Sequence, residues 1–225
     1  MTIKTTIFLF IASVLAIVGS AARAAEPWGS FRHIGIEDGL SHTTVPSITQ
    51  DTVGYIWVAT HDGLNRYDGH TFRTYRSDSD NPASLPDNVI QRVVCDPRGN
   101  LWILSHSNLT RYDRLLDAFE PNRLPEGDNT EFCAVAPLDS ARLLVGTSAA
   151  LYVFDIDSRT FKTIVPACNI NALAVLADTC YIGTPAGVSI ITRGSAKPVR
   201  LPGPTASVNA FATDGSDLWI ATEGS

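Results

Sequence analysis

The chain has 225 residues, a formal net charge of −6 and 44% hydrophobic residues. Because the balance is acidic and no run of Lys or Arg occurs, the sequence offers no electrostatic basis for binding nucleic acid or anionic lipid. Four cysteines in this length exclude a disulfide scaffold, so the fold must depend on a packed core.

Residues 1–24 are predicted to form a secretory signal peptide. Lys4 supplies a basic start, residues 7–18 are almost entirely apolar, and residues 22–24 form a small-x-small cleavage site. An uncleaved membrane anchor is the alternative, although the apolar run is shorter than the ~20 residues of a full span. We therefore expect export to the periplasm. Cleavage brings the formal charge to −8, because it removes two basic residues and no acidic one.

The rest of the chain repeats itself. The segment QDTVGYIWVATHDGLNRYDG at 50–69 returns as CDPRGNLWILSHSNLTRYDR at 95–114, and weaker echoes follow at 141–155, 179–192 and 216–225. The equivalent positions are Trp57, Trp102, Leu144, Tyr181 and Trp219. A repeat of this length with strand-like patterning in each copy predicts an all-β fold, a β-propeller of four-stranded antiparallel blades.

The first copy contains four short runs rich in β-branched or aromatic residues, at 45–48, 55–60, 64–67 and 72–75. Asp and Gly lie between these runs, for example at 62–63 and 68–69, where hairpins need tight or left-handed backbone. Four strands joined by hairpins make one blade.

The predicted domains follow from this pattern. An entry segment at 25–44 precedes the propeller and includes a predicted outer strand at 31–36, which resembles the fourth strands of blades one and three. The blades are expected at 45–76, 89–123, 132–165 and 171–201, with a truncated fifth blade at 208–225. About four and a half blades make an incomplete propeller. We expect a fragment of a longer protein, whose last blade would pair with the outer strand and close the ring.

The three tryptophans of the repeat are interpreted as core residues. Trp57 and Trp219 are each followed two positions later by alanine, and Trp102 by leucine. A large ring beside smaller neighbours fills the seam between wedge-shaped blades, so we expect packing here and no sugar-stacking platform.

The cysteine spacing fits no zinc pattern, because C-x-x-C is absent. Cys95 and Cys133 lie among apolar residues of predicted inner strands and are expected to be buried thiols. Cys168 and Cys180 lie in one repeat, and they either form a disulfide or remain thiols in the oxidising periplasm.

The sequence contains no motif for acyl transfer, zinc proteolysis or nucleotide binding, so we predict no catalytic residue and no cofactor. The one near cluster of metal-ligand types is His61, Asp62 and His70. Its members fall in loops at opposite ends of the predicted strands, so no metal site is expected. The turn starting at Asp51 is similar to a sialidase Asp-box, but a glycosidase needs two convergent carboxylates, which sequence does not place.

A ligand is expected on the face formed by the second-to-third strand loops and the blade-to-blade connections. This face carries the polar linker at 77–88 and the candidate ligand-binding residues His61, Asp62, His106, Ser107 and Asn108. Their side chains offer donors and acceptors for sugar hydroxyls, and propellers vary and recognise ligands in such loops. The alternative is that they are solvated turn residues.

The segment GLSHTTVPSITQDTVGYIWVATHDGLNRYDGHTFRTYR at 39–76 resembles the first blade of the two-component regulator propeller family. It has the Gly-Leu-Ser entry at 39–41, the Asp-x-x-Gly-x-apolar-Trp stretch at 51–57 and the Gly-Leu-x-Arg-Tyr-Asp hairpin at 63–68. Blade two keeps most of this pattern but has Asn108 where glycine is expected. Blades three and four keep only the apolar skeleton.

This resemblance implies a periplasmic sensor of a hybrid two-component system. In that family, two propellers, a β-sandwich and one membrane helix precede a cytoplasmic histidine kinase that starts a phosphorelay. It implies an oligosaccharide ligand, a homodimer of the full-length sensor, and membrane attachment only through a downstream helix outside this chain. The kinase segments are not in this chain, so no catalytic residue carries over. The alternative is a secreted propeller that binds glycan or protein without signalling; a propeller glycosidase is disfavoured.

Overall fold

The structure is a computed structural model that describes residues 32–125, 130–192, 197–203 and 205–223. It divides into two compact units, 1–34 and 35–225. In the first unit, the described residues 32–34 have no regular secondary structure. The predicted signal peptide lies outside the described residues.

The second unit contains five antiparallel sheets, one for each predicted blade. The first three blades are β1 (Ser47–Gln50), β2 (Ile56–Thr60), β3 (Gly63–Tyr67) and β4 (Phe72–Tyr75); β5 (Ile90–Cys95), β6 (Leu101–Ser105), β7 (Leu109–Asp113) and β8 (Ala118–Asn122); and β9 (Phe132–Pro137), β10 (Arg142–Thr147), β11 (Ala150–Asp155) and β12 (Thr160–Pro166). The others are β13 (Ala172–Leu176), β14 (Thr179–Thr184), β15 (Gly187–Thr192) and β16 (Val199–Arg200); and the pair β17 (Val208–Thr213) and β18 (Leu218–Thr222).

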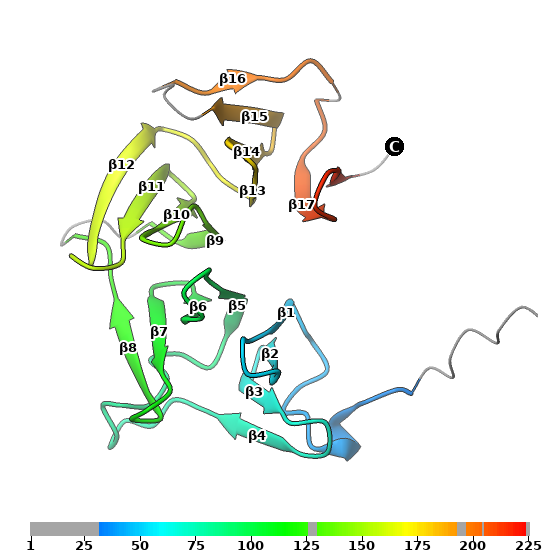
Figure 1. Cartoon of the computed structure of the whole chain (residues 1–225), viewed down its shortest axis with the longest axis vertical. Coiled ribbons are helices and arrows are strands. Elements are labelled where there is room, and N and C mark those ends of the chain that lie inside the picture. Colours follow the sequence, from blue (N-terminus) through cyan, green and yellow to red (C-terminus); the bar gives the residue numbers. More distant parts are fainter. Residues whose placement is uncertain (1–31, 126–129, 193–196, 204, 224–225) are drawn as a thin grey trace, which may run out of the picture. The chain divides into compact units, whose positions relative to one another are not determined.

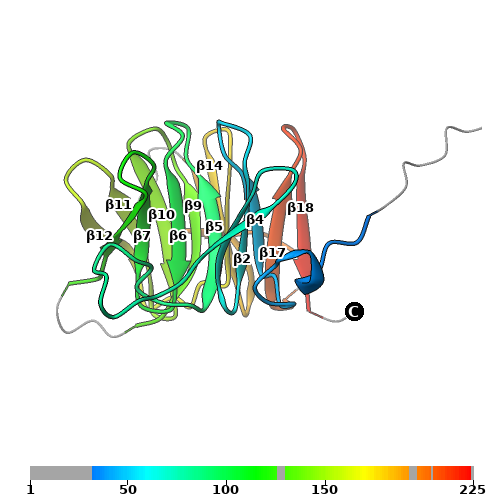
Figure 2. The ribbon, with the colours of Figure 1, turned by 90° about the horizontal axis from the view of Figure 1, so that it is seen from below.

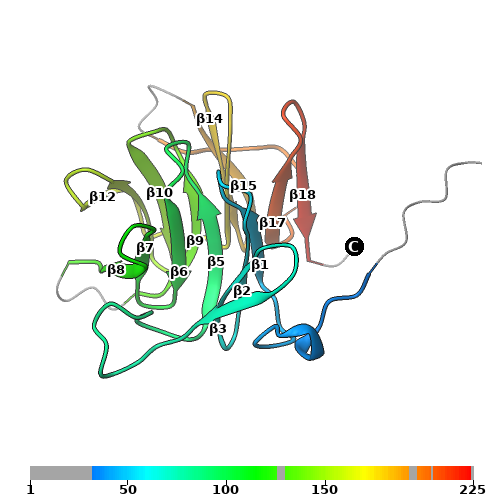
Figure 3. The ribbon, with the colours of Figure 1, turned by 60° about the horizontal axis from the view of Figure 1, so that its bottom comes forward.

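The arrangement of the sheets confirms the predicted β-propeller. Within each sheet, every strand pairs with the strand that follows it in the chain, so each blade is an up-and-down sheet. The first strands β1, β5, β9, β13 and β17 face a common centre and contact one another in that order, while β4, β8, β12 and β16 lie outermost (Figure 1). Figure 2 and Figure 3 show that the connecting loops collect at the two ends of the sheets.

The core lies in the seams between blades. Three clusters of buried apolar side chains each combine residues of two neighbouring blades: one and two, two and three, and three and four. Trp57 packs against Tyr112 of blade two, with ring centroids 4.9 Å apart, and Trp102 packs against Phe154 of blade three at 5.5 Å. Both tryptophans are at most 1% exposed, as the sequence predicts for core residues.

Trp219 differs from the other two tryptophans, because its side chain is 64% exposed in β18. The prediction that it is a core residue does not hold in this structure. In the first two blades the equivalent ring faces the following blade, and the described residues include no blade after β18. Among the described residues, no side chain of a following blade covers the ring of Trp219.

The predicted outer strand at 31–36 is also not observed. Residues 32–35 have no regular secondary structure, and Ile36 begins a short 3-10 helix, η1 (Ile36–Asp38). Phe31 lies outside the described residues. The outer strand of a blade pairs with the third strand, and the described sheet of β17 and β18 has only two strands.

Asp51 holds the tryptophan of its own blade and joins two blades. Its carboxylate accepts three backbone N–H groups of its own turn and the Nε1–H of Trp57 at 2.8 Å, and it is 5% exposed. Arg114, from the β7–β8 hairpin of blade two, donates to the same carboxylate at 2.9 Å. Asp96 likewise accepts the Nε1–H of Trp102 at 2.9 Å. The Asp-box-like turn is thus a structural element of the blade.

The four cysteines are free thiols in the structure. Cys95 and Cys133 are half-buried, somewhat more accessible than the sequence predicts. Cys168 and Cys180 both pack in the cluster between blades three and four, without a disulfide between them. Burial raises the pKa of all four thiols, so each is protonated and weakly nucleophilic near neutral pH.

Candidate functional site on the second-to-third strand turns

The turns that connect the second and third strands of blades one, three and four share a geometry based on a threonine hydroxyl. In blade one, Thr60 Oγ1 accepts the N–H of Asp62 at 3.0 Å and donates to the carbonyl of Gly63 at 2.8 Å. Thr147 and Thr184 make the corresponding bonds in blades three and four. The sequence analysis missed these residues, although a Thr or Ser at the same place in each repeat was a usable signal. The two hydrogen bonds of each threonine hydroxyl order its turn, and the residues that follow the threonine are presented to solvent.

Gly63 is required by this turn. Its φ of +103° lies in the left-handed region, and its N–H donates to the carbonyl of Asn88 at 2.7 Å in the connection to blade two. A Cβ at this position would lie 2.4 Å from the carbonyl oxygen of Tyr75. The turn that carries His61 is therefore hydrogen-bonded to the connection between blades one and two, and it packs closely against the end of β4.

Gly63→Ala is expected to lower the free energy of unfolding by more than ~2 kcal/mol, because left-handed strain adds to a clash with backbone. Gly69→Ala is the matched control, since Gly69 has a φ of +99° but nothing within 4 Å of its Cβ position. The control should cost only about 1 kcal/mol. Urea denaturation of both variants measures the difference, and equal losses would contradict the clash.

His61 and Asp62 belong to a polar cluster at the edge of blade one. The rings of His61 and His42 stack with centroids 6.0 Å apart, and Asp62 pairs with Arg76 at 2.9 Å. The hydrogen bond from Arg76 holds the pKa of Asp62 below its usual value, so this carboxylate is charged at neutral pH. His42 was not among the predicted site residues.

The Gly-Leu-Ser entry explains why His42 reaches this cluster. Ser41 Oγ lies 2.8 Å from Thr60 Oγ1 and accepts a hydrogen bond from Asn65 Nδ2 at 2.7 Å. The fully buried Asn65 in turn accepts the backbone N–H of Ser41 at 3.2 Å. Ser41 thus joins the entry segment to the β2–β3 turn by hydrogen bonds, and His42 is the next residue in the chain.

The second group of predicted residues lies on the equivalent turn of blade two. The exposed His106 contacts Gln91 Nε2 at 2.9 Å and lies 3.9 Å from a carboxylate oxygen of Glu131, at the start of blade three. Asn108 is buried: its amide donates to Ser107 Oγ at 2.8 Å and accepts from Arg123 at 3.0 Å. His106 and Ser107 are therefore presented to solvent, whereas Asn108 supports the turn.

His70 lies apart from these groups. It is in the β3–β4 turn, where its backbone N–H donates to Asp68, while His61 is in the β2–β3 turn at the other end of β3. The two histidines therefore do not converge, as the sequence predicts. Within the described ranges, no cluster of three or more His, Cys, Asp or Glu side chains is arranged to hold a metal ion.

The centre of the propeller has its own chemistry. Arg92 is the one charged residue among the five inner strands, β1, β5, β9, β13 and β17. It lines a cavity of about 240 Å³ together with Ser47 and Thr49. Burial lowers the pKa of Arg92, although a guanidinium remains charged at neutral pH. The charge of Arg92 thus makes this central cavity more favourable for a neutral or anionic ligand than for a cation.

Taken together, the β2–β3 and β6–β7 turns present imidazoles, a carboxylate–guanidinium pair and a hydroxyl at one end of the sheets. The turns are held by backbone hydrogen bonds to the connections between blades, including Phe132 N–H to the carbonyl of His106 at 2.9 Å. An ordered set of donors and acceptors suits recognition of a polyhydroxylated ligand, because each hydroxyl needs a partner of both kinds.

Comparison with known proteins agrees with this architecture. A model described as "Two component regulator propeller" matches residues 39–62 and 84–107, the repeats around Trp57 and Trp102. Histidine kinase P4 of Formosa agariphila is 44% identical over 73 residues, which are 32% of this chain and 5% of that relative. The chain therefore spans a small part of this kinase.

Solved structures show the same fold. The extracellular domain of a protein described as a hybrid two-component system from B. thetaiotaomicron superposes with a TM-score of 0.73 and 26% identity, covering 85% of this chain and 29% of that one. The extracellular domain of a protein described as a one-component system from the same organism superposes with a TM-score of 0.69 at 17% identity. The match covers 80% of this chain and 26% of that one. Virginiamycin B lyase from Staphylococcus aureus gives 0.65 at 14% identity, covering 80% and 63%, which shows the fold alone.

The fold and its turns define the class of protein as a β-propeller whose ordered loops face solvent. Within that class, two repeats of the chain, 39–62 and 84–107, match the model of the two-component regulator propeller. The chain spans less than one third of both the kinase relative and the extracellular domain of the hybrid system. Across the described residues, no helix has the length and apolarity needed to span a bilayer.

Proposed function

We propose that this chain is part of the periplasmic sensor of a hybrid two-component regulator, and that its β2–β3 and β6–β7 turns contribute to a carbohydrate-binding site. Ligand binding would favour one arrangement of a sensor homodimer, and a membrane helix would carry the change to a histidine kinase. Such coupling requires the ligand to bind one arrangement more tightly than the other. The kinase reaction is assigned to segments outside this chain, and no catalytic step is assigned to the propeller.

The match of the first two blades to the regulator propeller carries the proposal for a sensor. The likeness to an extracellular domain of a hybrid system supports a location outside the cytoplasm. The carbohydrate assignment depends on the exposed His61, His106 and Ser107, which lie on hydrogen-bonded turns and can form hydrogen bonds with a ligand.

A secreted propeller that binds glycan or protein without signalling is the second candidate. The two candidates differ in whether ligand binding changes kinase activity. Autophosphorylation of the whole protein in membrane vesicles, measured with and without an oligosaccharide that binds it, separates them. A ligand-dependent change in phosphorylation supports the sensor. Binding without any effect on a kinase supports the secreted module.

His61→Ala and His106→Ala are each expected to weaken glycan binding by the whole protein roughly 3- to 10-fold, because each removes a hydrogen bond worth about 1 kcal/mol. A glycan array identifies the bound oligosaccharide, and calorimetry then gives its affinity for each variant. His70→Ala is the matched control, because His70 lies in a turn at the other end of β3. Unchanged affinity in both test variants would remove these turns from the site, and no binding to any glycan would overturn the carbohydrate assignment.

A further inference from the structure

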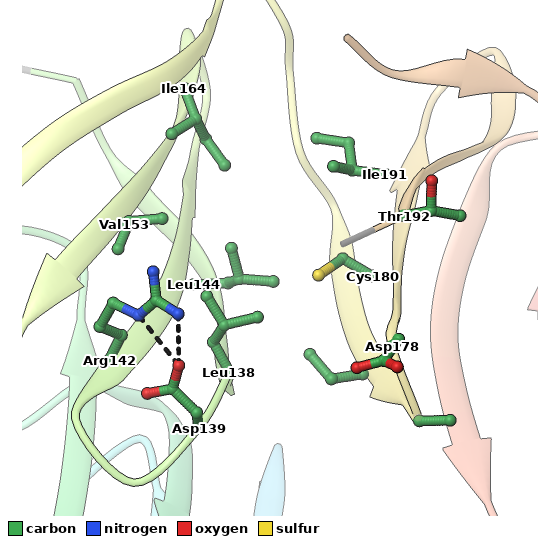
Figure 4. Close-up of a pocket in the computed structure, with 12 residues that line it drawn as sticks. Leu138, Asp139, Arg142, Leu144, Val153, Ile164, Asp178, Cys180, Ile191 and Thr192 are labelled. Carbon is green, nitrogen blue, oxygen red and sulfur yellow. Dashed lines mark hydrogen bonds and ion pairs between the residues drawn. The ribbon is translucent and has the colours of Figure 1, made fainter. Parts of the chain in front are cut away.

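The seam between blades three and four contains a cavity of about 280 Å³. Leu144, Val153 and Ile164 of blade three face Cys180 and Ile191 of blade four across it (Figure 4). Both blades are four-stranded sheets, so the cavity lies in a seam that has a four-stranded blade on each side. It is separate from the turns that carry His61 and His106.

Strand register shows what is missing from this seam. Trp57 pairs with Thr49 on the first strand of its blade, Trp102 with Val94, and Leu144 with Ala136. Leu144 therefore occupies the tryptophan position of blade three. In the two preceding seams the indole ring at this position is buried against the following blade.

The hydrogen-bond partner of the indole is missing as well. In blade one, the backbone N–H of Asp51 pairs with the carbonyl of Tyr55, and the Asp51 carboxylate accepts the indole N–H. The corresponding backbone pair in blade three joins Leu138 N–H to the carbonyl of Arg142 at 3.0 Å. Leu138 therefore stands where the aspartate stands in blade one. Blade three thus has leucine at both positions of the Asp–Trp pair, and a cavity lies beside these two leucines.

The walls of the cavity are mainly apolar, and a charged pair lies on the blade-three wall. Arg142 pairs with Asp139 at 2.6 Å, as the dashed lines in Figure 4 show, and both side chains are more than one-third exposed. Asp178 and Thr192 line the cavity from blade four. A molecule in the cavity would thus meet an apolar surface within the seam and a charged pair on its solvent side.

We propose that this seam binds a small planar aromatic molecule, with its ring in the position that tryptophan takes in the first two seams and a polar substituent directed toward Arg142 and Asp139. Volume supports this ligand class, because an apolar cavity of about 150 Å³ already accepts benzene. A sugar fits the walls less well, since most of its hydroxyls would be buried against apolar side chains without partners. The proposal does not depend on the carbohydrate assignment.

Indole is the probe for the test. Titration calorimetry on the whole protein should show saturable indole binding, and Leu144→Trp should weaken it at least about tenfold, because the new ring fills the same space. Ile191→Phe fills the cavity from blade four and should act in the same direction if Leu144→Trp fails to fold. Leu116→Trp is the matched control, because Leu116 is 74% exposed in the β7–β8 turn.

A second readout locates the binding. Cys180 lines the cavity, so bound indole should slow its alkylation by a small thiol reagent, while the rates at Cys95 and Cys133 should not change. Peptide mapping by mass spectrometry gives each rate. Absence of indole binding to the folded protein overturns the proposal, as does binding that Leu144→Trp and Ile191→Phe leave unchanged. His61→Ala and His106→Ala should not affect indole, so failure here is distinguishable from failure of the glycan site.

Discussion

Replacing Trp57 with alanine is expected to lower the free energy of unfolding by about 3–5 kcal/mol, the range for large aromatic residues in cores. The ring is fully buried between blades one and two and contacts both Tyr75 and Tyr112. Its removal opens a cavity in the seam and leaves the Asp51 carboxylate without its indole donor. Urea denaturation followed by circular dichroism measures the loss.

Trp57→Phe separates the two contributions. It keeps an aromatic ring in the seam but removes the Nε1–H, so we expect a loss of about 1–2 kcal/mol. In the 225-residue chain, Trp219→Ala should cost much less than Trp57→Ala, because Trp219 is largely exposed in this structure. If Trp57→Ala and Trp219→Ala destabilised the chain equally, the assignment of Trp57 to a closed seam would be wrong.

Asp51→Ala is expected to cost about 3 kcal/mol at pH 7, because it removes an ionised acceptor of several hydrogen bonds. The backbone N–H groups of the turn and the indole of Trp57 lose their partner together. Arg114 of blade two also loses its contact with blade one, although its own exposure limits that part of the cost. Urea denaturation at pH 7 gives the difference from wild type.

The loss at Asp51 should depend on pH. Burial by itself would raise the pKa of Asp51, but the hydrogen bond from Trp57 and the charge of Arg114 outweigh it, and the pKa lies below its usual value of 3.8. A carboxyl whose pKa is lowered by folding stabilises the protein above its unfolded-state pKa, and this contribution disappears as the pH falls through the folded-state pKa. The difference between wild type and Asp51→Ala should therefore shrink below about pH 4.

A surface carboxylate provides the comparison. Asp157 pairs with Arg98 at 2.8 Å, but its side chain is 70% exposed. Asp157→Ala should leave the free energy of unfolding at pH 7 unchanged within the error of the measurement, because solvent screens an exposed ion pair. A constant difference between wild type and Asp51→Ala from pH 7 to pH 3 would show that the charge of Asp51 does not contribute to the seam.

The candidate ligand residues show how far local reasoning extends. The repeat placed His61 and His106 on equivalent turns, because the segments 50–69 and 95–114 align without a gap and both lie between two strand-like runs. It did not distinguish the buried Asn108 from the exposed Ser107, since both are polar residues of one turn. Nor did it find His42, which reaches His61 only because Ser41 bonds to Thr60 and Asn65.

The sequence by itself determined the all-β class, the order of the strands and their grouping into blades. These features depend on alternating side chains and on turn residues that are close together in the chain, and the observed sheet of blade one, 47–75, lies within the predicted 45–76. Only the tertiary structure decided what each seam contains. Arg114 contacts Asp51 across a seam, Trp219 is largely exposed, and a cavity lies beside Leu138 and Leu144. The reason is that seam packing depends on the volumes of side chains from two different blades, which no single repeat specifies.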